Sequence, residues 1–257
     1  MDNYEPERPL DDSQMNPPQW NWKDLLLILI SIVVIFVLGL ILLSFFPNSL
    51  SIATLQQQGP SLVYSASLAA LEAIALVASI YFMGMRAHDL NWREVGLKPV
   101  PRYWLVRAIT VTIIVIPIIG LIALGIRYAL NLPLENPQMQ FLAPKNFSWI
   151  GALGMLLMGG LAVPFAEELF FRGVLFVWIR NKLGFWIGAI ISAAIFGILH
   201  GDISVAGATF VMGLILAWFY ENSKSLWPPI MIHAVYNSLE LIFLYATIAF
   251  GLTLPGG

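Results

Sequence analysis

Two adjacent glutamates, Glu167 and Glu168, lie inside an apolar stretch and are followed four residues later by Arg172. A charged side chain at the centre of a membrane helix costs roughly 2.5–3.5 kcal/mol on insertion scales. The presence of three charged side chains within six residues therefore requires a structural or functional explanation. Glu168 and Arg172 stand in the favourable order for an ion pair on one helix face, and such a pair has a purely structural explanation. Glu167 is rotated by about 100° from Glu168 on a helix and has no local partner. An unpaired carboxylate in an apolar site is a candidate general base.

Two histidines in later apolar stretches could share this chemistry. His200 ends the segment Phe196–His200, and His233 precedes Asn237 by four residues, so the last two side chains share a helix face. A single histidine in a membrane helix is more often a packing residue than a catalyst. Here two of the chain's three histidines lie in apolar stretches. An imidazole and an amide on one face can both donate hydrogen bonds to an oxyanion.

The composition indicates a chain that is mostly surrounded by lipid. Of its 257 residues, 59% are hydrophobic and only 11% are charged, with a mean hydropathy of +0.80. A soluble domain usually carries about 25% charged residues. The net charge of −2 gives no reason to expect a nucleic-acid partner, and the absence of cysteine excludes thiolate chemistry. The lipid bilayer is therefore the first expected partner.

Seven apolar segments predict an all-α, polytopic membrane helix bundle of about seven transmembrane helices. Each is long enough to cross, or nearly cross, about 30 Å of hydrocarbon, and no ten-residue alternating pattern suggests a membrane barrel. The fourth segment is too long for one untilted span, and Pro164 is expected to kink it just before the glutamates. The predicted spans are 25–45, 61–85, 104–126, 148–179, 185–201, 204–221 and 229–250.

The distribution of lysine and arginine predicts the orientation. Ten of these residues fall on the side of the N-terminus and only Arg127 and Lys145 on the other. Because cytosolic loops carry the excess of basic residues, the N-terminus is expected in the cytosol and the C-terminus outside. The first 24 residues resemble neither a secretory signal nor a transit peptide. We expect an integral, multi-pass protein of a bacterial plasma membrane.

Three regions follow from this pattern. Residues 1–24 are polar, acidic and proline-rich and are expected to form a disordered cytosolic tail. Residues 25–130 hold the N-terminal transmembrane helices, and residues 145–250 hold the helices with the chemically interesting side chains. Glu72, midway along the second span, is expected to serve packing or assembly, and Glu240 shares the face of His233 and could support the site.

Three short motifs carry a family resemblance. Residues 167–172 read EExxxR, residues 196–200 read FxxxH, and residues 233–237 read HxxxN. In this order, on separate membrane helices, they resemble the CPBP family (CAAX proteases and bacteriocin-processing enzymes, also called the Abi family). The resemblance covers roughly residues 145–250, with no motif residue replaced. It implies a CPBP-type catalytic core and an intramembrane endopeptidase that acts on a membrane-associated peptide or protein.

The resemblance also implies roles for four residues. Glu167, the first motif glutamate, acts with His200 to activate a water molecule. His233 and Asn237 stabilise the oxyanion of the tetrahedral intermediate. These roles agree with the chemistry expected of an unpaired carboxylate, a histidine that shares a proton, and two hydrogen-bond donors.

The same resemblance gives Glu168 and Arg172 a supporting role and favours a mechanism without a cofactor. Zinc is the alternative, since two histidines and a glutamate could hold it and leave a position open for water. The alternative ligands are Glu167, His200 and His233. The HExxH motif of many zinc proteases is absent from the sequence.

Two other functions remain open, together with one geometric problem. The chain could be a non-catalytic membrane scaffold or bacteriocin-immunity protein that binds a partner through the same cavity. A proton-coupled transporter is disfavoured because no repeated halves are found. Counted from the cytosolic ends, Glu167 and His200 lie about 20 Å deep, whereas His233 lies near the start of its span. We therefore expect a break at Pro228 and Pro229 that lets the backbone before His233 dip into the membrane.

Overall fold

The computed structural model describes residues 18–45, 61–134, 137–144 and 147–251, and all regular structure within these ranges is helical. Six helices are long and apolar enough to span a membrane, and a seventh apolar helix is shorter. The predicted all-α, multi-pass membrane bundle is therefore confirmed. The elements are α1 (Trp22–Ser44), α3 (Leu62–Ser79) with η2 (Ile80–Met85) and η3 (Arg86–His88), α4 (Arg102–Ala129), α5 (Pro137–Leu142), α6 (Trp149–Leu157), η4 (Met158–Ala162), α7 (Val163–Phe170), η5 (Phe171–Phe176), α8 (Val177–Leu183), α9 (Phe185–Ile198), α10 (Ile203–Ser223) and α11 (Trp227–Ala249).

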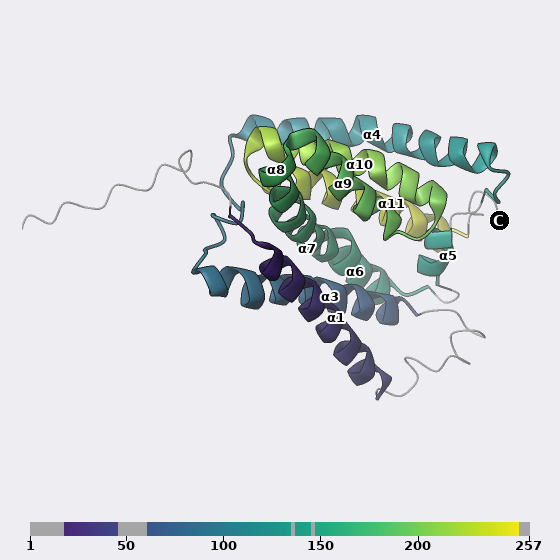
Figure 1. The fold of residues 1–257 in the computed structure, drawn as a ribbon. Coiled ribbons are helices and arrows are strands. Elements are labelled where there is room, and N and C mark those ends of the chain that lie inside the picture. The colour runs from purple at the N-terminus through teal and green to yellow at the C-terminus, as the bar shows by residue number, and fades with distance from the viewer. Residues whose placement is uncertain (1–17, 46–60, 135–136, 145–146, 252–257) are drawn as a thin grey trace, which may run out of the picture.

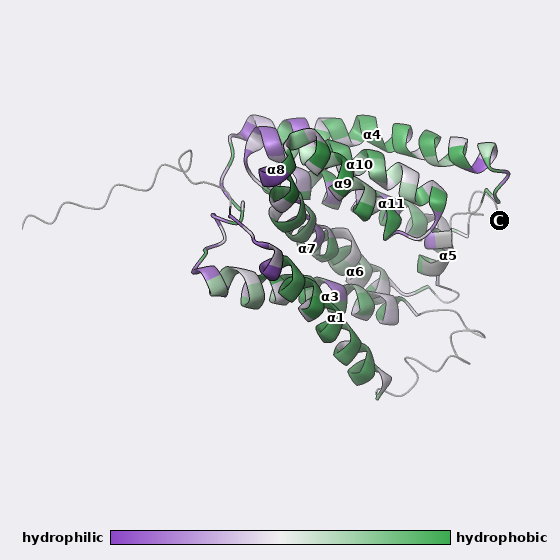
Figure 2. Cartoon of the chain, in the orientation of Figure 1, coloured by the Kyte–Doolittle hydropathy of each residue, from purple (hydrophilic) through white to green (hydrophobic). Residues whose placement is uncertain are grey.

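The helices form two groups, one on each side of the segment that carries the glutamates. The continuous helical segment α6–η4–α7–η5–α8 runs obliquely through the middle of the bundle (Figure 1). On one side it contacts α3, which packs against α1, and on the other side lie α9, α10, α11 and α4. Helices α1 and α4 are hydrophobic along most of their length, with hydrophilic residues concentrated near their ends (Figure 2). Their exposed apolar side chains suit contact with lipid.

The fourth predicted span is a single helical segment of 35 residues, Trp149–Leu183. Pro164 lies in the first turn of α7, directly after the π-helical turn η4, and a second π-helical turn, η5, follows α7. A π-helical turn shifts the hydrogen-bond register, which is one way in which a helix accommodates a proline. The two glutamates thus lie on a short α-helix between two π-helical turns.

The fifth predicted span is only 14 residues long in the structure, Phe185–Ile198. At 1.5 Å per residue this gives about 21 Å, less than the roughly 30 Å of a hydrocarbon core. The helix therefore ends before it could cross the hydrocarbon core, and His200, two residues after its end, lines a cavity inside the bundle. The following turn leads directly into α10, whose N-cap is Asp202.

The structure corrects two expectations. The first 17 residues of the predicted tail lie outside the described residues, but its last part is ordered: Trp20 is buried, its Nε1 donates to the carbonyl of Gly173 at 2.8 Å, and Asn21 caps α1. The expected break at Pro228 and Pro229 is also wrong, since both occupy the first turn of the continuous helix α11. Proline fits there because the first backbone N–H groups of a helix have no intrahelical partner.

The start of α11 is instead buried by the loop that precedes α4. The Leu226 N–H donates to the carbonyl of Gly96 at 2.8 Å, and the Ser225 hydroxyl donates to that of Lys98 at 2.6 Å. The side chains of Ser225 and Leu226, which directly precede α11, are fully buried. This cover places the first turns of α11 inside the protein and lets His233 reach the central helix.

Basic residues from different elements meet at this same end of the bundle. Arg180 at the end of α8 and Lys224 at the end of α10 both bind Glu221, each at 2.7 Å. This arrangement agrees with the predicted clustering of basic residues on one side. The assignment of that side to the cytosol stays a prediction.

Candidate active site

The centre of the candidate site is a buried ion pair joined to a histidine. Glu168 Oε1 accepts from Arg172 Nη1 at 2.7 Å, and the side chains of both residues have no exposed surface. The same oxygen lies 2.9 Å from His233 Nδ1. Because a carboxylate only accepts hydrogen bonds, His233 must carry its proton on Nδ1 in this contact. The sequence indicated the Glu168–Arg172 pair, but not that Glu168 also orients the histidine of the third motif.

Arg172 is held from two further directions. Its Nη2 donates to the carbonyl of Gly213 on α10 at 3.2 Å. A Cβ atom at Gly213 would lie 2.8 Å from Cβ of Ala193 on α9, so only glycine allows this close approach. The guanidinium also lies over the ring of Phe196, 4.8 Å from its centroid, in a cation–π contact.

Glu167 faces a different direction and remains partly accessible. Its Oε2 lies 3.5 Å from His233 Nε2, and 13% of its side chain is exposed. Among the described residues it makes no ion pair with lysine or arginine. The sequence resemblance paired Glu167 with His200, whereas the direct contact in the structure is with His233. A carboxylate with free oxygen surface beside an imidazole can accept a proton from a bound water molecule.

His200 is fixed in a single tautomer by the backbone of its own helix. Its Nδ1 lies 2.8 Å from the carbonyl oxygen of Phe196, four residues earlier. Since a carbonyl can only accept, Nδ1 carries the proton and Nε2 of the neutral ring is left as an acceptor. The ring of Phe196 packs edge-on against both histidines, with centroid distances of 4.8 Å to His200 and 5.6 Å to His233. The phenylalanine of the FxxxH motif therefore orients three groups of the site.

Asn237 completes the set from the same face of α11 as His233. Its amide Nδ2 donates to the carbonyl of Gly159 in the π-helical turn η4 at 3.4 Å, and Ser238 donates to that of Gly160 at 3.3 Å. These two contacts tie α11 to the helix that carries the glutamates. One hydrogen of the Asn237 amide is left for another acceptor.

Three of the four predicted catalytic residues line one cavity of about 470 Å³. They are His200, His233 and Asn237, and Glu167 contacts His233 next to them. Glu72, Tyr236 and Glu240 line the same cavity. The sequence suggested packing for Glu72; its only signal for a place in the site was an ionisable side chain in the middle of a span.

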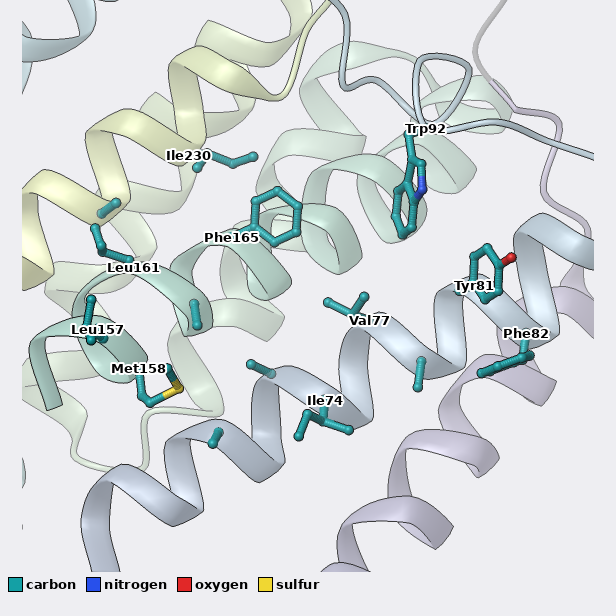
Figure 3. Close-up of a pocket in the computed structure, with 15 residues that line it drawn as sticks. Ile74, Val77, Tyr81, Phe82, Trp92, Leu157, Met158, Leu161, Phe165 and Ile230 are labelled. Atoms are coloured by element: carbon teal, nitrogen blue, oxygen red, sulfur yellow. The ribbon is translucent and has the colours of Figure 1, made fainter. Parts of the chain in front are cut away.

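A larger hollow of about 960 Å³ lies between α3 and the central helix but contains none of the motif residues. Figure 3 shows the side chains of Ile74 and Val77 on α3 facing Met158 and Phe165 across this groove. Its lining is almost entirely apolar, so it can hold hydrocarbon but cannot itself hydrolyse a bond. The chemistry therefore belongs to the smaller cavity.

The predicted zinc ligands Glu167, His200 and His233 are not gathered into one metal-binding group in the structure. In the described part of the chain, no group of three or more His, Cys, Asp or Glu side chains is placed to hold a metal ion. One ring nitrogen of His200 is occupied by a carbonyl and one of His233 by Glu168, which leaves only the two Nε2 atoms and Glu167. The metal-free mechanism stays a prediction, with zinc as its alternative.

Comparison with known proteins gives a family match over the segment that holds all three motifs, and two curated relatives. Residues 149–239 match the family described as "Type II CAAX prenyl endopeptidase Rce1-like". The candidate membrane peptidase YdiL of Bacillus subtilis (strain 168) is 32% identical over 88 residues, which are 34% of this chain and 36% of that protein. The membrane-embedded CAAX protease MroQ of Staphylococcus aureus (strain USA300) is 34% identical over 86 residues, 31% of this chain and 35% of that protein.

The chain thus aligns with about a third of the length of these curated relatives. No solved structure matches it significantly. Both relatives are bacterial membrane proteins by name, and the six apolar helices of this chain agree with that setting. The resemblance to CAAX proteases that the motifs indicated is confirmed, since residues 149–239 of this multi-pass membrane protein are similar to the Rce1-like family.

Proposed function

We propose that the chain is an intramembrane endopeptidase that hydrolyses a peptide bond of a membrane-associated protein or peptide. The observation that carries this proposal is that His200, His233 and Asn237 line one cavity and that Glu167 contacts His233 beside it, which brings two proton acceptors and two hydrogen-bond donors into one region. Glu167 and His200 Nε2 are the acceptors, and His233 and Asn237 are the donors. The Rce1-like match over the same residues supports a membrane protease.

The tautomer of His200 supports its assignment to water activation. Its Nδ1 proton is bound to the Phe196 carbonyl, so Nε2 can accept a proton from water but cannot donate to an oxyanion while the ring is neutral. The water oxygen attacks the carbonyl carbon of the scissile bond, and its proton passes to Glu167 or His200. General-base catalysis of this kind contributes typically 10²–10⁴-fold to a rate.

His233 and Asn237 are assigned to the oxyanion. In its imidazolium form His233 donates Nδ1–H to Glu168 and Nε2–H to the oxygen of the tetrahedral intermediate. Asn237 adds its free amide hydrogen from one turn further along α11. When the intermediate collapses, the C–N bond breaks and the proton taken from water passes to the leaving amine.

The apolar groove beside the cavity fits a substrate that is held in the membrane. Phe165 in its lining is two residues before Glu167, and Ala234 directly follows His233. Hydrocarbon bound in the groove would therefore contact residues that are adjacent in the chain to Glu167 and His233. This neighbourhood supports a membrane-associated substrate.

Comparative membrane proteomics tests the proposal. Cells with the wild-type protein are compared with cells that carry Glu167→Gln, and new peptide termini are identified. Glu94→Gln, which removes a charge from the loop between η3 and α4 and from none of the residues that line the cavity, is the matched control. We expect at least one terminus that is lost in Glu167→Gln and kept in the control. Identical sets of termini in all three strains would favour a non-catalytic scaffold.

A further inference from the structure

Glu72 is an ionisable residue of the cavity that the proposed reaction does not use. It lies in the middle of α3, and its side chain lines the same cavity as His200, His233 and Asn237. Helix α3 lies outside the Rce1-like segment 149–239, so this residue belongs to a part of the chain without a family match.

The carboxylate of Glu72 has no counter-charge of its own. Within the described ranges, no hydrogen bond or ion pair reaches it, and no lysine or arginine lines the cavity. The nearest motif cation, Arg172, is occupied by Glu168 and the carbonyl of Gly213. An unpaired acid within a membrane helix is costly, and such residues usually mark a binding or transport pathway.

Glu240, the other acid in the cavity away from the glutamate motif, provides a useful contrast. Tyr236, one turn earlier on α11, is a polar neighbour of its carboxyl group. The carboxyl group of Glu240 therefore has a polar neighbour on its own helix, whereas the carboxyl group of Glu72 is available to a molecule bound in the cavity. A structural role explains Glu240 but leaves Glu72 without a partner.

We propose that Glu72 determines specificity by binding a cationic side chain, lysine or arginine, of the substrate segment that occupies the cavity. This inference rests on the endopeptidase function proposed above. The long flexible stem of lysine or the planar fork of arginine can extend through an apolar cavity and place its charge at the carboxylate. Glu72 comes from α3, whereas His200 lies in the turn after α9 and His233 on α11, so such a contact would fix the substrate segment relative to the reacting groups.

Quenched fluorescent peptides with an apolar leucine–alanine sequence test this inference in proteoliposomes. One lysine, glutamate or alanine is placed in turn at each position, and kcat and KM are measured for the wild type, Glu72→Gln and Glu72→Lys. We expect the wild type to prefer lysine over alanine at one position by about tenfold, the factor given by one charge-assisted hydrogen bond. The preference should appear in KM, vanish in Glu72→Gln and turn towards glutamate in Glu72→Lys.

Glu240→Gln is the matched control, because it removes the other acid of the cavity and should retain the lysine preference. An unchanged preference in Glu72→Gln would overturn the inference, as would an equal loss for all three peptides. Binding of the same peptides is measured in the Glu167→Gln background. A lysine preference in binding that depends on Glu72 supports the inference even without cleavage, whereas equal binding overturns it. The failure of catalysis is thus separated from the failure of recognition.

Discussion

The neighbouring glutamates of the first motif should respond in opposite ways to the same substitution. Glu168→Gln removes the only carboxylate bound to Arg172 among the described residues, and neither side chain has any exposed surface. Breaking a buried ion pair by removing one partner costs about 3–5 kcal/mol, because the other charge stays buried. Arg172 Nε already lacks a hydrogen-bond partner in the structure, and the other acceptor of the arginine, the carbonyl of Gly213, carries no charge.

The expected loss can be measured as a change in thermal stability. For chains of roughly this size, 1 kcal/mol corresponds to about 2–4 °C in Tm, so Glu168→Gln should unfold roughly 6–20 °C below the wild type in detergent. Glu167→Gln removes a partly exposed carboxylate without isolating a charge, and its stability should stay within about 1 kcal/mol of the wild type. Peptide cleavage should nevertheless be lost in Glu167→Gln.

A double substitution tests the reason for this difference. If the cost comes from the isolated arginine, Glu168→Gln combined with Arg172→Met should recover most of the lost stability, since an apolar pair can replace a buried ion pair. A double variant as unstable as Glu168→Gln would refute the reasoning. So would a Glu168→Gln protein with wild-type Tm.

Three further predictions concern other parts of the fold. Gly213→Ala should destabilise by about 1–3 kcal/mol in thermal unfolding, because its Cβ would lie 2.8 Å from that of Ala193; wild-type stability would contradict the close packing. Trp20→Phe should cost roughly 1–3 kcal/mol, since it removes the buried hydrogen bond to the carbonyl of Gly173, and an unchanged Tm would mean that the N-terminal segment is not anchored. Burial opposes ionisation of Asp202, but hydrogen bonds and a neighbouring arginine outweigh it and hold the pKa of this carboxyl group below its usual value. Its contribution to stability is therefore present above about pH 4 and lost as the pH falls through the lowered pKa, and Asp202→Asn should remove that acid-sensitive part from a pH series of unfolding measurements.

The sequence predicted the helices well because hydropathy is a local property. The spans agree with the structure to within a few residues, and the i, i+4 spacing of Glu168 and Arg172 predicted their ion pair. The motif order also indicated that His200, His233 and Asn237 belong together, and the structure places all three at one cavity.

Contacts between distant segments could not be predicted in the same way. The bond from Glu168 to His233 spans 65 residues, and the bond from Trp20 to Gly173 spans 153. Neither hydropathy nor helical spacing reports on such pairs, so Trp20 was assigned to a disordered tail. The π-helical turns around the glutamates were also missed, because a shift in hydrogen-bond register leaves no periodic signal in so short a segment. Glu72 was assigned to packing because nothing in its local sequence shows that it faces the site.

The most direct test of the proposed chemistry is peptide cleavage by purified protein after exhaustive chelation, with metal content measured in parallel. If Glu167 and His200 activate water themselves, the wild type should cleave at an unchanged rate without stoichiometric metal, and Glu167→Gln should not cleave. Stoichiometric zinc, with activity that disappears on its removal and returns on its addition, would contradict this mechanism and make Glu167, His200 and His233 metal ligands. Cleavage by Glu167→Gln at the wild-type rate would contradict the role of the glutamate altogether.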